Sequence, residues 1–123
     1  TDVRPRDEAS AKQAGLVGRF GRLDPASTEA VFEHEVTPDS GGWASATVVN
    51  ESAGLRLVLA WATDGLPRFH QWVSRKPGWY VLGLEPANCS VMGRAFDRAR
   101  GNLPLLTAGT RRTTQIKLEI GDI

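Results

Sequence analysis

Apolar and polar residues alternate along much of the chain, and this alternation predicts β-strands. In residues 28–36, TEAVFEHEV, the pattern places Ala30, Phe32, His34 and Val36 on one face, while the opposite face is mostly glutamate. A period of two residues is typical of a strand with one buried and one solvated face. We therefore expect a half-buried strand here, with His34 more plausible as a core histidine than as a ligand.

Two further runs, residues 43–50 and 54–62, are joined by the short polar link ESAG, which predicts a β-hairpin. In the second run every other residue from Leu55 to Trp61 is large and apolar, so that side should face the core. Residues 67–78 are aromatic and basic and are bounded by prolines. We expect a short strand beside an exposed loop there.

The most apolar run is WYVLGLEP, residues 79–86, and we expect it to be a central strand of its sheet. The chain ends in another alternating run, residues 111–123, in which Ile116, Leu118 and Ile120 share a face. Short strands separated by turn signals, with little room for long helices, are typical of an antiparallel sandwich.

The fold class expected from this pattern is all-β, an antiparallel β-sandwich over residues 28–123. Residues 1–27 are rich in Pro, Gly, Arg and Asp, and we expect an irregular lead-in with a short helical turn over residues 7–14. Residues 87–101 have helical or loop character.

Composition adds mainly exclusions. The 123 residues are 41% hydrophobic and 24% charged, which fits one domain with a modest core. A formal net charge of +1 gives no global attraction to nucleic acid or to an anionic membrane, and no apolar run approaches the length of a bilayer span. One cysteine, Cys89, and two histidines allow no internal disulfide and no zinc cluster, and nothing calls for another metal or a cofactor. Together with the polar start, these features favour a cytoplasmic location.

Glu85 is the first candidate for chemistry. An unpaired carboxylate at the end of an apolar strand costs several kcal/mol, so it needs a physical reason to be there. Pro86 cannot extend the hydrogen-bond ladder, so we expect the strand to stop or bend at this point and to present Glu85 at a strand end. A partly desolvated carboxylate is a useful general base. The alternative is a structural ion pair with one of the arginines.

The segment FHQW offers a sugar platform. A tryptophan ring such as that of Trp72 can pack against the C–H face of a pyranose while His70 and Gln71 bind hydroxyl groups. The alternative is that Trp72 fills the core with His70 at its edge. The arginines after residue 93 are a third candidate, because guanidinium groups bind vicinal hydroxyls and anions. Of these, Arg94 stays open as a substrate contact, whereas Arg98 and Arg100 fit a solvated helix face.

The motifs P.FHQW, YVLGLEP.NC, the GR that follows, and G.LP.L..G identify a resemblance. Residues 28–123 resemble the C-terminal portion of the aldose 1-epimerase-like family in the galactose mutarotase superfamily, in particular its bacterial branch known as a domain of unknown function. The resemblance implies a β-supersandwich about twice this length. It also implies a reaction in which a glutamate deprotonates the anomeric hydroxyl of a sugar and a histidine protonates the ring oxygen.

Glu85, in LGLEP, matches the glutamate of that family, which favours the base role over the ion pair. The histidine acid of the family lies in its N-terminal half, and neither His34 nor His70 falls at that motif. The resemblance therefore implies a C-terminal fragment with an incomplete site, inactive alone, that pairs with the missing half or with a second copy. The alternative is a carbohydrate-binding module that holds a sugar without turning it over.

Overall fold

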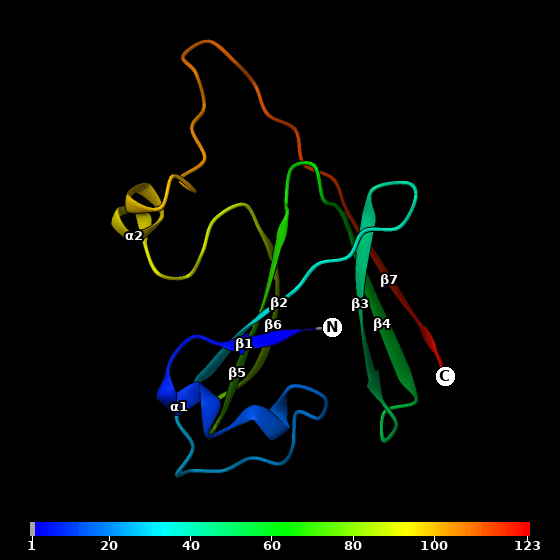
Figure 1. The fold of residues 1–123 in the computed structure, drawn as a ribbon. Helices are drawn as coiled ribbons and strands as arrows, with labels where there is room; N and C mark the ends of the chain where they lie inside the picture. Colours follow the sequence, from blue (N-terminus) through cyan, green and yellow to red (C-terminus); the bar gives the residue numbers. More distant parts are fainter. Residues whose placement is uncertain (1) are drawn as a thin grey trace.

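The computed structural model describes residues 2–123, which form two antiparallel sheets facing each other (Figure 1). The predicted all-β sandwich is confirmed. The four-stranded sheet has the order β1-β2-β5-β6 and the three-stranded sheet the order β3-β4-β7. The strands are β1 (Val3–Pro5), β2 (Ala30–His34), β3 (Trp43–Asn50), β4 (Leu55–Ala62), β5 (Arg68–Lys76), β6 (Trp79–Ala87) and β7 (Ile116–Asp122).

Two hairpins supply most of the pairing. β3 and β4 pair from Trp43 opposite Ala62 to Asn50 opposite Leu55, which confirms the first predicted hairpin. Residues 68–76 form a nine-residue strand, longer than the short one expected, and pair with β6 along its whole length. The turn between them is Pro77-Gly78, and Gly78 adopts a φ of 77°, a conformation that glycine takes at little cost.

The position of β6 corrects two expectations. It is an edge strand of its sheet, not a central one, and it continues through Pro86 to Ala87. Pro86 lies opposite Phe69 in the β5–β6 register. A proline fits there because an edge strand has one side on which no partner needs the missing N–H. Glu85 therefore lies within a strand instead of at its end.

The N-terminal segment joins the four-stranded sheet. β1 pairs with β2, followed by the helix α1 (Glu8–Ala11) and the 3₁₀ turn η1 (Ala14–Leu16). The helical turn was predicted, but β1 was not, because three residues are too few for a periodic signal. The Asp7 side chain caps α1 by accepting the Ser10 backbone N–H at 2.8 Å. This bond and the Arg6 guanidinium lower the pKa of Asp7 to about 2. The buried Ser10 hydroxyl accepts the Val31 N–H at 3.0 Å, which ties the segment to β2.

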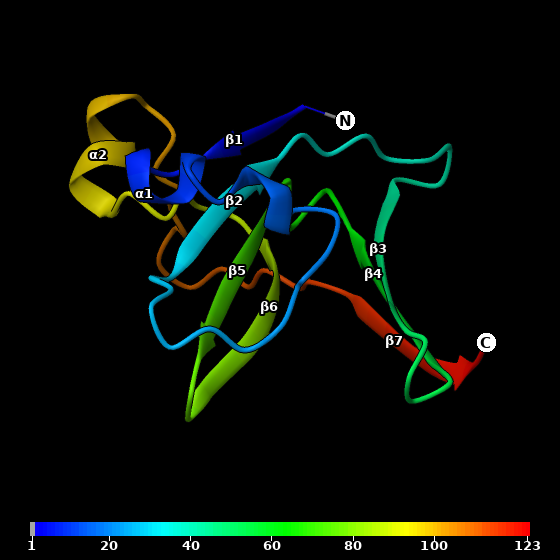
Figure 2. The same ribbon diagram turned by 90° about the horizontal axis from the view of Figure 1, so that it is seen from below.

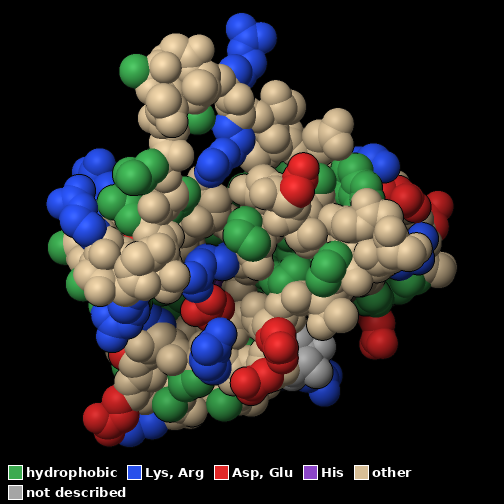
Figure 3. All heavy atoms as spheres, turned by 45° about the horizontal axis from the view of Figure 1, so that its top comes forward, with side chains coloured by type: hydrophobic (Ala, Val, Ile, Leu, Met, Phe, Trp, Pro, Cys, Tyr) green, Lys and Arg blue, Asp and Glu red, His purple; other side chains and the backbone are tan. Residues whose placement is uncertain are grey.

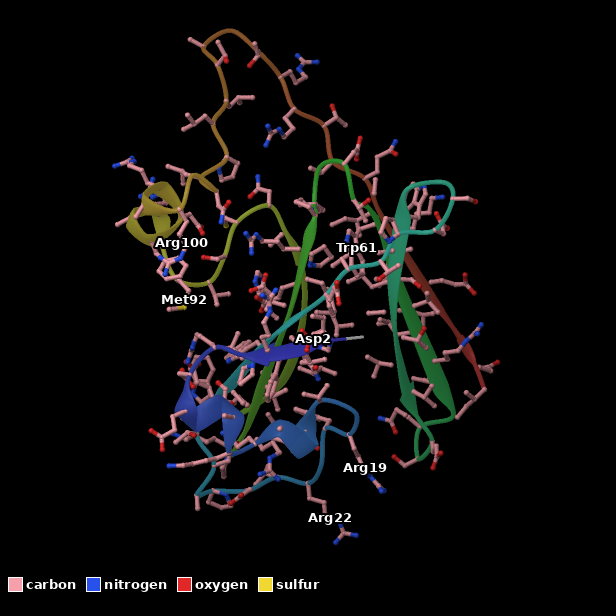
Figure 4. The ribbon with its side chains drawn as sticks, in the orientation of Figure 1. Asp2, Arg19, Arg22, Trp61, Met92 and Arg100 are labelled. Carbon is pink, nitrogen blue, oxygen red and sulfur yellow. The ribbon has the colours of Figure 1, made fainter. Side chains whose placement is uncertain are left out.

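Trp61 joins the two sheets. Its side chain, labelled in Figure 4, is 2% exposed. The ring stacks on Phe69 of β5 with 4.8 Å between ring centroids. Ala44 and Leu59 complete this cluster. A second cluster, centred on Phe32, packs the four-stranded sheet against the segment around η1. Away from Trp61 the sheets diverge, as the view in Figure 2 shows.

The segment after β6 contains α2 (Arg94–Ala99), a helix beside the four-stranded sheet on the side away from β3 and β4 (Figure 1). This agrees with the helical or loop character expected for residues 87–101, except that Ala87 still belongs to β6. Acidic and basic side chains are interspersed on the face seen in Figure 3, consistent with a net charge near zero. None of the helices in the described part of the chain has the length and hydropathy needed to cross a membrane.

Candidate functional site

The candidate site lies on the outer face of the four-stranded sheet, which we define as the face turned away from the three-stranded sheet. Side chains alternate between the two faces of a strand. Residues 69, 71, 82 and 84 line the space between the sheets, so their neighbours in sequence point outward. The outer face carries Glu33 of β2, His70 and Trp72 of β5, and Gly83 and Glu85 of β6.

Glu85 and His70 lie directly opposite each other in the β5–β6 register. Glu85 is exposed, which corrects the expectation of a partly desolvated carboxylate at this position. Its side chain folds back along the strand: a Cβ built on Gly83 would lie 2.5 Å from Glu85 Oε1 and 3.2 Å from Trp72 Cβ. A side chain at residue 83 would contact Trp72 closely and would displace the flexible end of the Glu85 side chain. The glycine leaves room for the Glu85 carboxylate beside Trp72.

His70 is 1% exposed, and its Nε2 has no hydrogen-bond partner within residues 2–123. Burial lowers the pKa of His70, and the nearby carboxylates of Glu33 and Glu85 oppose this effect without cancelling it. The ring is thus held neutral near neutral pH. Since its ring is buried, His70 does not offer the substrate contact expected from the sequence.

Acidification should destabilise the protein through His70. Below the ordinary histidine pKa of about 6.5, the unfolded chain binds a proton at residue 70 that the native chain does not bind. The free energy of unfolding therefore decreases as the pH is lowered, by up to about 1.4 kcal/mol per pH unit. Urea midpoints measured between pH 7.5 and 5.5 should show this fall, and His70→Gln should flatten it. Parallel curves for the two proteins would rule out this role for His70.

Trp72 is half-buried on the outer face, and its indole Nε1–H donates to Glu29 Oε2 at 3.1 Å. Glu29 also accepts from Arg6 at 3.1 Å. The ring orientation is therefore fixed by the hydrogen bond to Glu29, while the Glu85 carboxylate and the Cβ of Trp72 both lie beside Gly83. A fixed aromatic ring beside a carboxylate can stack on the C–H face of a sugar while the carboxylate binds a hydroxyl group.

A cavity of about 460 Å³ lies between the outer face and α2, and His70, Trp72 and Glu85 are not among its lining residues; we call it the α2 cavity. Glu33, which lies opposite His70, and Arg68 form its floor, joined by an ion pair of 2.7 Å. Arg100 lines the opposite wall, with its guanidinium 3.6 Å from the centre of the Phe96 ring. Figure 4 shows Arg100 and Met92 on this side of the molecule. Arg100 was expected on a solvated helix face, and it is exposed, but it also borders this cavity.

The structure separates the other two expected substrate contacts from this group. Gln71 points to the opposite face of the sheet, where it donates to the Val17 carbonyl at 3.2 Å and pairs with His34 Nε2 at 2.9 Å. Arg94 is exposed at the start of α2 and is not among the residues that line the α2 cavity. Neither residue can act together with Glu85 in this arrangement.

Another cavity lies between the diverging sheets and has a volume of about 670 Å³. We call it the inter-sheet groove. Its lining mixes apolar side chains of both sheets with polar ones, which include His34, Gln71, Arg19, Glu35 and Thr37. Half-buried His34 is on the inner face, as its strand pattern indicated. The groove therefore has polar groups that could bind a ligand, but Glu85, His70 and Trp72 do not line it.

Sequence reasoning missed Glu33, Arg68 and Gly83. The alternation of side chains along β5 could have identified Arg68, because every second residue of a strand points to the same face. Arg68, His70 and Trp72 must therefore share one face, and Gln71 must point to the other. Glu33 could not be added to the group from sequence, because its register against β5 is a tertiary property. Among the described residues, no group of three or more His, Cys, Asp or Glu side chains could hold a metal ion.

Fold and site together define a β-sandwich protein with a polar, aromatic-bearing sheet face. The chain belongs to the family described as a domain of unknown function, DUF4432, whose model matches residues 1–120. No curated protein and no solved structure matches the chain.

Proposed function

We propose that the outer face of the four-stranded sheet binds a sugar, and that Glu85 is the proton acceptor in an aldose 1-epimerase-type exchange of its anomers. One observation carries the proposal: Glu85 lies on the outer face between His70, held neutral by burial, and Trp72, whose ring is fixed by Glu29. The sequence resemblance of LGLEP to the glutamate motif of the epimerase-like family supports the same role.

In the proposed reaction Glu85 accepts the proton of the anomeric hydroxyl. The C1–O5 bond breaks as a carbonyl forms at C1, and a proton donor delivers a proton to the ring oxygen. Rotation about C1–C2 and the reverse steps give the other anomer, so no net proton is consumed. His70 is not that donor, because it is buried and a neutral imidazole donates protons poorly. The ring-oxygen donor is therefore a group other than His70.

A non-catalytic carbohydrate-binding module is the second candidate. It is favoured by the exposure of Glu85, which lines neither the α2 cavity nor the inter-sheet groove. A general base in an enzyme is usually more enclosed than this. Both candidates place the sugar on the same face and differ in whether anomer exchange is accelerated.

Titration with D-galactose and D-glucose, followed by the indole N–H resonances of the four tryptophans, tests the location of binding. We expect the Trp72 resonance and the amides of Gly83 and Glu85 to shift, while Trp61, in the inter-sheet groove, does not. Trp72→Ala should abolish the shifts. Trp79→Ala is the matched control, because Trp79 is an exposed tryptophan at the far end of the same hairpin. Shifts confined to Trp61 and Gln71, or no shift at all, would refute the proposed site.

A further inference from the structure

β7 leaves one edge of the three-stranded sheet open. Within the described residues it pairs with β4 alone. Its residues Ile116, Leu118 and Ile120 lie opposite Trp61, Leu59 and Leu57, so they extend the apolar inner face of the sheet beyond the core. They are 55%, 61% and 64% exposed. An edge strand with unpaired backbone groups and a row of large exposed apolar side chains is a template for pairing with another strand.

The sequence of this edge is complementary to itself. In IKLEI, Leu118 lies at the centre, Lys117 and Glu119 flank it, and isoleucines stand at both ends. When two copies of this strand run antiparallel about a two-fold axis at Leu118, Lys117 of one copy lies opposite Glu119 of the second. Each Ile116 lies opposite an Ile120, and the two Leu118 side chains face each other.

We propose that a second copy of the chain covers this edge. The two β7 strands pair antiparallel about Leu118 and form one continuous six-stranded sheet with the order β3-β4-β7-β7-β4-β3. A two-fold interface uses the same patch on both subunits, so self-complementarity is its physical requirement. The apolar row continues across the junction on the inner face, and two Lys117–Glu119 ion pairs close it on the opposite face.

Neighbouring registers are less favourable for identifiable reasons. Moving the axis to residue 117 sets Lys117 against Lys117, and moving it to residue 119 sets Glu119 against Glu119. A slip that places the axis between two residues turns the apolar row of one copy toward the polar face of the other. The charges and the apolar row together therefore specify the register centred on Leu118.

The contacts that Lys117 and Glu119 make within one chain leave both side chains able to form the ion pairs between copies. Glu119 lies 3.6 Å from Arg56 in an exposed ion pair, and it can accept a second cation on its other side. The Lys117 ammonium lies 4.0 Å over the Trp43 ring. The flexible four-carbon stem of a lysine lets the ammonium swing from this ring to the edge of the sheet.

Charge reversal tests the register. Sedimentation equilibrium of the 123-residue chain should show a reversible dimer, and Lys117→Glu or Glu119→Lys should each raise the dissociation constant by about tenfold, since each creates two like-charge pairs. The double variant, Lys117→Glu with Glu119→Lys, should recover wild-type affinity. Far-UV circular dichroism verifies that each variant is folded. A monomeric wild type, or a double variant as weak as the single ones, would overturn the proposal.

A crosslink tests the same contact independently of charge. Opposing Cα atoms in an antiparallel pair are about 4.5–5.5 Å apart, within the range a disulfide spans. In a Cys89→Ser background, Leu118→Cys should form a disulfide-linked dimer under mild oxidation. Val49→Cys, an exposed position on β3 at the other edge of the same sheet, should stay monomeric under the same conditions. Equal crosslinking of the two variants would contradict pairing through β7.

Discussion

Trp61→Ala should lower the free energy of unfolding by about 3–5 kcal/mol, the range found when a large buried aromatic is truncated. Trp61 is 2% exposed, belongs to the three-stranded sheet, and stacks on Phe69 of the other sheet. Its removal takes away the main aromatic contact between the two layers. A domain of this size is stable by about 5–15 kcal/mol, so a large share would be lost.

Urea unfolding followed by far-UV circular dichroism measures this loss. Trp79→Ala is the matched control, because Trp79 is 65% exposed at the tip of the β5–β6 hairpin and its truncation should cost no more than about 0.5 kcal/mol. Trp61→Phe should cost less than alanine, since it keeps a ring opposite Phe69 and removes an indole N–H that has no partner among the described residues. Equal costs for Trp61→Ala and Trp79→Ala would mean that the sheets are held together elsewhere.

Glu85→Gln should reduce the acceleration of anomer exchange by about 10²–10⁴-fold, the usual contribution of a positioned general base. Glutamine has nearly the same shape and keeps an oxygen beside Trp72, so sugar binding should survive. The substitution thus separates proton transfer from recognition. Asp24→Asn is a suitable control, because Asp24 lies in the loop before β2 and pairs at 3.2 Å with Arg75, which is near the β5–β6 turn and opposite Tyr80, not Glu85.

The strand pattern was readable from sequence because each strand has one apolar face. The alternation in residues 54–62 gave the strand, its core side and the position of Trp61 without any tertiary information. The final strand showed Ile116, Leu118 and Ile120 on one face in the same way. Alternation does not reveal strand order, however, and so it could not show that the most apolar strand, β6, lies at an edge.

The site was less predictable for the same reason. Glu85, His70 and Trp72 were chosen by residue type, and β-pairing brings them onto one face. Gln71 was chosen as a neighbour of Trp72 in sequence, although adjacent residues of a strand point to opposite faces. The Glu33–Arg68 ion pair depends on the register between β2 and β5. The α2 cavity depends on how the segment after β6 packs against the four-stranded sheet. Neither is encoded in a local pattern.

The exchange rate between the α and β anomers of D-galactose, measured by two-dimensional NMR exchange spectroscopy, tests the role of Glu85 most directly. With the protein purified from its source cell we expect exchange faster than in buffer, and with Glu85→Gln we expect the buffer rate while the Trp72 indole resonance still shifts with sugar. Undiminished exchange in Glu85→Gln would show that the carboxylate of residue 85 is not the proton acceptor.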